Sequence, residues 1–207
     1  PYTLAVTLLD ACPPAAGWDV KILATDIDTA VLATAARGVY PLDRLADVPP
    51  DVLRRHFLKG TGPNDGLAAV RPQARELIAF QQLNLMADRW AVRGPFDAIF
   101  CRNVIIYFDR PTQATLLGRF ADLLAPGGHL VLGHSENIHG LCDRFAPVGR
   151  TVYRLADDPG GRGPRRAAPV PPPAATAGSA GASPAQPPEH TIVLGDVKAV
   201  RGPAVLK

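Results

Sequence analysis

Apolar and polar positions along the first 155 residues alternate between two patterns. Short continuous apolar runs, typical of buried strands, occur at residues 20–25, 96–101 and 129–133. Before and between these runs, apolar positions recur at helical spacing in three segments. They are residues 2–11, residues 28–38, where Asp28 can cap the helix and Gly38 can end it, and residues 111–125. Strands that alternate with helices at these lengths predict an α/β fold with a parallel sheet flanked by helices.

Two segments depart from this alternation. Residues 40–80 contain a short helix that begins at Pro49–Pro50 and a long turn over residues 60–66 between short apolar stretches. They predict an inserted helix and a small antiparallel sheet, and insertions of this kind often carry recognition. Residues 145–155 hold two apolar stretches around Gly149 and Arg150, which predicts an antiparallel hairpin at the edge of the main sheet.

The composition changes after residue 155. Residues 156–190 are rich in proline, alanine and glycine, which predicts a disordered or extended linker, with a proline-rich docking ligand as the alternative. Residues 191–194 and 197–200 are predicted to form two short strands around a Gly195–Asp196 turn. We therefore expect a domain over residues 1–155, a linker over 156–190 and the beginning of a second, β-containing domain over 191–207.

Charge and composition exclude several classes of function. The chain carries 22 Lys and Arg against 19 Asp and Glu, and these basic residues are scattered rather than gathered as a nucleic-acid surface would require. No apolar run approaches the roughly 18 residues of a membrane-spanning helix. The three cysteines are too far apart for a disulfide framework, which favours a reducing, cytoplasmic setting. The histidines do not cluster at metal-ligand spacing, so no metal site is predicted.

Candidate chemistry lies just after the predicted strands, where ligands bind in open parallel sheets. Asp26 ends one strand and could accept hydrogen bonds from a ribose diol, or it could cap the next helix, a role that Asp28 fills better. Arg102 and Asn103 follow the next strand; Asn103 suits a zwitterionic or amide-bearing ligand, or it could fix its own loop. The segment 133–137 has part of a serine-nucleophile pattern but lacks its last glycine, so a hydrolase is not favoured.

No glycine-rich phosphate loop occurs in the chain. In nucleotide-binding α/β domains such a loop precedes the first helix, and this chain opens directly at that helix with Pro1. We therefore expect the glycine turn and its strand to lie upstream of Pro1.

Five segments together resemble the catalytic domain of CheR-type chemotaxis receptor methyltransferases, across roughly residues 1–155. In order, they are PYTLA at 1–5, ATDID at 24–28, GTGP at 60–63, FCRNVIIYF at 100–108 and GHSEN at 133–137. The resemblance implies a Rossmann-like sheet that binds S-adenosylmethionine. It also implies a bacterial, cytoplasmic enzyme of chemotaxis signalling that methylates receptor glutamates to methyl esters. Because the family's amino-terminal helical domain and glycine-rich loop are missing, we expect an amino-terminally truncated domain that is inactive by itself.

The resemblance also implies roles for single residues. Asp26 corresponds to the acidic residue that holds the ribose, and Asn84 and Leu85 match the segment beside the adenine. Arg102 and Asn103 match the loop under the methionine part of the cofactor. Tyr107 matches an aromatic residue close to the transferred methyl group, although a core tyrosine beside Phe108 is the alternative.

The two outlying segments resemble parts of known proteins as well. The insertion at 40–80 is similar to the family's β-subdomain, which in some members binds a peptide at the receptor's carboxyl terminus. Residues 191–207 resemble the start of a CheD-type receptor deamidase. Two other functions stay open, namely a small-molecule methyltransferase of the same fold and a non-catalytic receptor-docking module.

Overall fold

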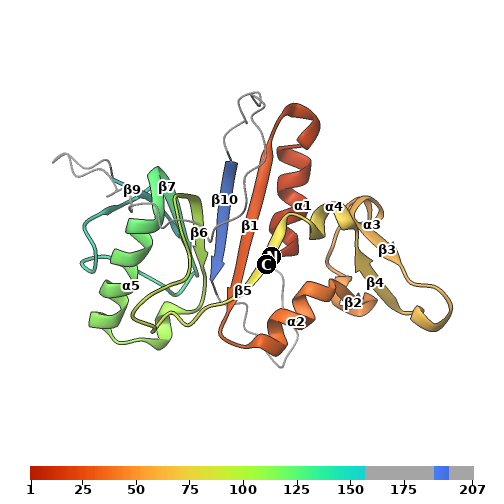
Figure 1. Ribbon diagram of the computed structural model, residues 1–207, viewed down its shortest axis with the longest axis horizontal. Coiled ribbons are helices and arrows are strands. Elements are labelled where there is room, and N and C mark those ends of the chain that lie inside the picture. The colour runs from red at the N-terminus through yellow and green to blue at the C-terminus, as the bar shows by residue number, and fades with distance from the viewer. Residues whose placement is uncertain (157–188, 196–207) are drawn as a thin grey trace, which may run out of the picture.

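The computed structural model describes residues 1–156 and 189–195 of the chain. Seven strands form one sheet in the order β5-β1-β10-β6-β7-β9-β8 (Figure 1). The first five strands in this order run parallel, and at one edge β9 pairs antiparallel with β7 and β8 pairs antiparallel with β9. Their bounds are β1 Asp19–Asp26, β5 Ile78–Gln82, β6 Phe96–Cys101, β7 Leu124–Leu132, β8 Phe145–Pro147, β9 Val152–Leu155 and β10 Glu189–Gly195. The predicted α/β fold is confirmed.

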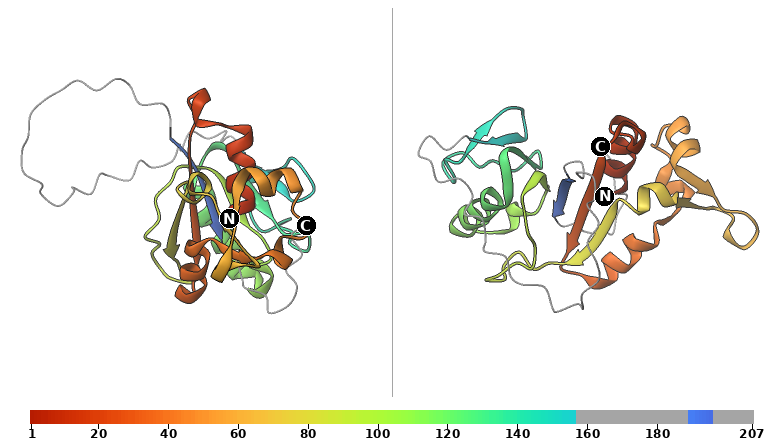
Figure 2. Two further views of the ribbon diagram at one scale, coloured as in Figure 1. Left: turned by 90° about the vertical axis from the view of Figure 1, so that its right-hand side faces the viewer. Right: turned by 45° about the horizontal axis from the view of Figure 1, so that its top comes forward.

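Helices flank the sheet, and a second sheet projects from it. The helices are α1 Tyr2–Ala11, α2 Thr29–Arg37, α3 Pro50–His56, α4 Pro72–Arg75 and α5 Arg110–Leu123. The small antiparallel sheet has the order β2-β4-β3, with β2 at Val39–Pro41, β3 at Phe57–Lys59 and β4 at Leu67–Val70. Figure 2 shows this three-stranded sheet, with α3, to one side of the main sheet. The predicted inserted helix and antiparallel sheet are therefore present, although β5, which the sequence did not predict, belongs to the main sheet.

Two apolar clusters hold the domain together. One joins α5 to β6 and β7 and includes Phe96, Leu117, Phe120 and Leu130. The other joins α1 and α4 to β1, β4 and β5. In the second cluster Tyr2 is buried, and its hydroxyl donates a hydrogen bond to the carbonyl oxygen of Ala35 (2.8 Å), which ties α1 to α2.

The caps of α2 follow the sequence prediction. The Asp28 side chain accepts hydrogen bonds from the backbone N–H groups of Ala30 (2.7 Å) and Val31 (3.3 Å), and the helix ends at Gly38 with a φ of 62°. A Cβ at Gly38 would lie 2.9 Å from the Tyr2 hydroxyl oxygen, so this position has both a conformational and a packing reason to be glycine. Because Asp28 caps α2, Asp26 is left for another role.

The sequence predicts a turn at Pro126–Gly128 that leads into a strand at 129–133, whereas in the structure this segment is part of strand β7. Strand β7 begins already at Leu124, and its pairing with β6 shifts between Phe96 and Ala98. The additional residues of β7 are accommodated as an irregularity in which Gly127 has a φ of 73°. The predicted hairpin at the sheet edge is confirmed as β8 and β9.

Strand β10 takes a place that the sequence analysis did not foresee. Residues 191–207 were expected to begin a separate domain, whereas residues 189–195 pair in parallel with both β1 and β6 at the centre of the main sheet. The physical reason is that β1 and β6 each present an unpaired edge of backbone N–H and C=O groups unless a strand lies between them. The expected strand at 197–200 and nearly all of the predicted linker lie outside the described residues.

Candidate functional site

The carboxyl ends of the parallel strands define the candidate site. From β1 the chain proceeds to β5 on one side of the sheet, and β6 and β7 follow on the other side. In open α/β sheets the ligand site lies where the strand order reverses in this way, beyond the carboxyl ends of the strands. The loops after β1, β5, β6 and β7 all leave from this edge (Figure 1). All six residues that the sequence analysis assigned to a site lie in or beside these loops.

Asp26 stands at the last position of β1 with its side chain buried, at 5% exposure. Its Oδ1 accepts a hydrogen bond from the Asp28 N–H (2.9 Å), and its backbone oxygen accepts one from the Leu83 N–H (2.9 Å). Its Oδ2 is buried and accepts no hydrogen bond from the described part of the chain. A buried carboxylate oxygen without a donor is costly, so this atom is suited to receive hydroxyl groups from a ligand.

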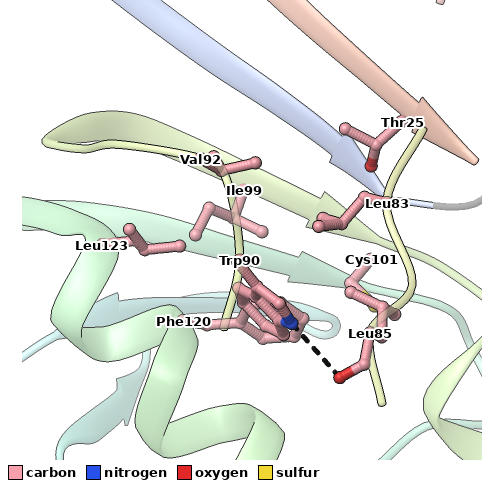
Figure 3. Close-up of a pocket in the computed structure, with 9 residues that line it drawn as sticks. All are labelled: Thr25, Leu83, Leu85, Trp90, Val92, Ile99, Cys101, Phe120 and Leu123. Carbon is pink, nitrogen blue, oxygen red and sulfur yellow. Dashed lines mark hydrogen bonds between the residues drawn. The ribbon is translucent and has the colours of Figure 1, made fainter. Parts of the chain in front are cut away.

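The loop after β5 carries Asn84 and Leu85. The Asn84 Oδ1 accepts a hydrogen bond from the Met86 N–H (2.9 Å), so this oxygen is already engaged within its own turn. The Leu85 side chain lines an apolar pocket together with side chains from β1, β6, α5 and the same loop (Figure 3). The lining residues are Thr25, Leu83, Leu85, Trp90, Val92, Ile99, Cys101, Phe120 and Leu123.

This loop is fastened to α5 by groups that the sequence analysis did not identify. The Trp90 ring lies 5.6 Å from the Phe120 ring, and its Nε1 donates a hydrogen bond to the Leu85 carbonyl oxygen (3.3 Å). The Arg119 guanidinium lies over the Trp90 ring at 5.3 Å and donates a hydrogen bond to the Ala87 carbonyl oxygen (2.6 Å). The loop after β5 is thus fixed against α5, and the apolar pocket between them has an open volume of about 10 Å³, which is room for a water-sized group and not for a ring.

Arg102 and Asn103 occupy the loop after β6, and both are exposed. Asn103 has a φ of 60°, a left-handed conformation that is uncommon for a residue with a side chain. The backbone of this loop is held by the buried Glu136 carboxylate, which accepts hydrogen bonds from the N–H groups of Asn103, Val104 and Ile105. Glu136 thus makes the hydrogen bonds that hold this backbone, while Asn103 takes the left-handed position that asparagine tolerates better than most residues.

Tyr107 lies in the 3-10 turn Ile105–Tyr107 that follows this loop. Its side chain is 64% exposed, which rules out the alternative of a core tyrosine. Gln113 stabilises the turn from α5, because its side-chain amide donates hydrogen bonds to the carbonyl oxygens of Ile105 and Phe108 (both 2.9 Å). An exposed phenol on a fastened turn beside the site is suited to contact a bound ligand.

The segment after β7 continues into turns and not into the helix that a serine-nucleophile elbow requires. His134 and Ser135 are exposed, whereas Glu136 is buried at 5% exposure. Within residues 1–156 and 189–195 no group of three or more His, Cys, Asp or Glu is placed to hold a metal ion. None of the helices in these ranges is both long enough and apolar enough to cross a bilayer.

Comparisons with known proteins agree with this geometry. Residues 1–154 match the family model described as CheR methyltransferase, SAM binding domain. The "Chemotaxis protein methyltransferase 2" of Pseudomonas aeruginosa is 50% identical over 160 residues, which cover 75% of this chain and 55% of that protein. The "Chemotaxis protein methyltransferase" of Escherichia coli is 49% identical over 159 residues, covering 76% and 55%. That of Salmonella typhimurium is 48% identical over 159 residues, covering 76% and 54%. The chain thus spans about half the length of these relatives.

Proposed function

The chain belongs to the CheR methyltransferase family, and from this we propose that its protein transfers methyl groups from S-adenosylmethionine to glutamate side chains of chemotaxis receptors. The products are glutamate methyl esters, which adjust receptor signalling. The family domain that the chain matches is the one that binds S-adenosylmethionine. The observation that carries the proposal is the buried Asp26 Oδ2, which accepts no hydrogen bond from residues 1–156 and 189–195 and stands at the strand end where the sheet reverses its order.

The residues at the sheet edge fit the parts of this cofactor. In our proposal Asp26 accepts hydrogen bonds from the ribose hydroxyls, because its Oδ2 has no other donor in the described chain. The adenine lies along the Asn84–Leu85 segment, whose Leu85 side chain lines the apolar pocket. Arg102 and Asn103 present exposed polar side chains to the charged methionine part. Tyr107 lies close to the methyl group.

The reaction requires alignment rather than acid–base catalysis. S-adenosylmethionine supplies a methyl group on a positively charged sulfur. A glutamate carboxylate is already ionised at neutral pH, so no side chain has to remove a proton from it. The protein's task is to hold the carboxylate oxygen in line with the methyl and the sulfur and to exclude water. This accounts for a site composed of binding groups, without a histidine or cysteine nucleophile.

The small antiparallel sheet supports a protein substrate over a small molecule. Within the part of the chain that the structure describes, β2 and β3 each pair only with β4, so each leaves one edge available for an added strand. Leu58 on β3 is 45% exposed and Val39 on β2 is 41% exposed, and these give the two edges an apolar contact. We propose that one edge binds a carboxyl-terminal receptor peptide, which would raise the local substrate concentration.

The peptide proposal is tested by calorimetry with receptor carboxyl-terminal peptides. We expect Leu58→Glu to weaken binding and the equivalent change on the other edge, Val39→Glu, to leave it unchanged if β3 is the docking strand. The opposite result would assign the peptide to β2. Unchanged binding in both variants, or no binding to the wild-type protein, would refute the peptide site while leaving the methyltransferase proposal intact.

We propose a cytoplasmic location for the protein, where its receptor substrates expose their signalling domains. The three cysteines Cys12, Cys101 and Cys142 are free thiols, as is usual in a reducing compartment.

The activity is tested with the protein at its natural length. It is incubated with S-adenosylmethionine tritiated in the methyl group and with receptor-containing membranes. We expect label in the receptor band that is released as volatile methanol by mild base, because esters hydrolyse there and methyl amines do not. Receptor-free membranes are the control. Binding of cofactor and receptor without transfer would identify a docking module and overturn the proposal.

A further inference from the structure

Glu136 is a buried carboxylate whose hydrogen bonds all go to the backbone around the site. Its Oε1 accepts hydrogen bonds from the N–H groups of Val104 and Ile105 (both 2.8 Å). Its Oε2 accepts hydrogen bonds from the N–H groups of Asn103 (2.9 Å) and Gly133 (2.6 Å). One side chain thereby joins the loop after β6 to the turn after β7.

These four bonds decide what Glu136 can do. A carboxylate offers about four acceptor positions, and here four backbone donors fill them. The residue is only 5% exposed, so these backbone groups enclose the Glu136 carboxylate. Successive backbone N–H groups that converge on one anion form a concave binding arrangement, and in this case the anion belongs to the chain itself.

The arrangement controls the conformation of Asn103. This residue has a φ of 60°, which costs energy for a residue other than glycine unless the surroundings impose it. Glu136 holds the Asn103 N–H, while Val104 and Ile105 are buried and anchor the same loop in the core. As a result Arg102 and Asn103 are exposed at the sheet edge on a fixed backbone, with the Asn103 side-chain oxygen lying over Gly133.

Gly133 allows this close approach. A Cβ at Gly133 would collide with the Asn103 Oδ1 and would lie 2.9 Å from both the Asn103 nitrogen and the Glu136 Oε2. Any side chain at Gly133 would therefore push the Asn103 loop away from the end of β7.

On this basis we propose that Glu136 is a positioning residue for cofactor binding, which acts by fixing the backbone that carries Arg102 and Asn103. The inference rests on the proposed function, since it assigns these two side chains to the methionine part of the cofactor. Glu136 lies in the GHSEN segment at 133–137, but the sequence pattern gave it no role.

The central variant is Glu136→Gln, which keeps the shape of the side chain. The amide has one acceptor oxygen, and its NH2 group would face two backbone N–H donors. We expect the dissociation constant for S-adenosylhomocysteine, measured by calorimetry on the protein at its natural length, to rise roughly tenfold or more, which is about 1.4 kcal/mol. Val70→Ala is the control, because Val70 is buried in the other apolar cluster, which contains no residue of this loop.

The same substitution in a double mutant separates a positioning role of Glu136 from general destabilisation of the protein. In a protein that already carries Arg102→Ala and Asn103→Gly, the side chains through which Glu136 acts are gone, and glycine retains the left-handed backbone. Here Glu136→Gln should change the dissociation constant by less than about threefold, since coupled residues give non-additive effects. An equal loss in both backgrounds would show that Glu136 is only structural and would overturn the proposal.

Hydrogen exchange on the wild-type protein gives a measurement that needs no variant and no cofactor. The amides of Asn103, Val104, Ile105 and Gly133 should be protected, although they lie outside regular pairing in a loop and a turn. Rapid exchange of these amides would refute the proposal even if Glu136→Gln does not fold. If wild type shows the protection but binds no S-adenosylhomocysteine, the proposed function fails instead.

Discussion

Replacement of Asp26 by asparagine separates ligand binding from folding at the centre of the site. The Asp26 Oδ1 accepts the Asp28 N–H at 2.9 Å, and the asparagine oxygen can retain this hydrogen bond. The asparagine NH2 would take the place of Oδ2, which accepts no hydrogen bond from the described chain. We therefore expect the unliganded protein to lose little stability, because a buried charge is removed, the bond to Asp28 remains, and one buried polar group without a partner in the described chain replaces another.

The cost should appear only when the cofactor binds. An amide NH2 cannot accept a hydrogen bond from a ribose hydroxyl. Hydrogen bonds to charged groups are worth about 1.5–3 kcal/mol, so even one lost bond should raise the dissociation constant roughly tenfold to a hundredfold.

The assay is calorimetric titration with S-adenosylhomocysteine, together with thermal unfolding in its absence. Asp28→Asn is the matched control, since it removes the same charge two residues away and leaves a good helix cap on α2. Asp28→Asn should bind like wild type. A dissociation constant for Asp26→Asn within threefold of wild type, or a marked fall in its Tm without ligand, would show that Asp26 is structural.

Three further predictions concern other parts of the chain. Tyr107→Phe should lower kcat more than it changes the KM for cofactor, with no change in Tm because the side chain is exposed; a Tm loss would contradict this placement. Burial raises the pKa of Tyr40 to about 12, so the neutral phenol's contribution to the free energy of unfolding is complete below pH 10 and is lost as pH rises through 12. In Tyr40→Phe the denaturant midpoint should therefore fall less steeply between pH 10 and 12, and the same pH dependence as wild type would contradict this prediction. Ending the 207-residue chain at residue 156 removes β10, the strand between β1 and β6, and should lower the denaturant midpoint; an unchanged midpoint would contradict the central place of β10.

Sequence patterns were sufficient where a residue's role is local. The Asp28 cap, the Gly38 helix end and the hairpin of β8 and β9 follow from spacing and turn chemistry, and all three are present. The prediction that polar residues at strand ends share one edge also holds, because parallel strands in one sheet bring their carboxyl ends together. Whether Asp26, Asn84, Leu85, Arg102, Asn103 and Tyr107 bind the cofactor stays a prediction.

The features that the sequence did not indicate depend on residues far apart in the chain. Glu136 bonds to amides 31 to 33 positions earlier, and Arg119 holds a carbonyl 32 positions earlier. Strand β10 begins 88 positions after β6 ends (Glu189 against Cys101), yet the two strands pair. Local periodicity contains no information on such partners, so only the assembled sheet identifies them.

The most direct test of the proposed activity is to identify the atom that receives the methyl group. Receptor methylated by the protein at its natural length is digested under acidic conditions, which preserve esters, and the labelled peptides are sequenced by mass spectrometry. We predict the methyl on glutamate side chains in the receptor's cytoplasmic helices, with base releasing it as methanol. A methyl on lysine, cysteine or a free small molecule, or none at all with active cofactor binding, would contradict the assignment.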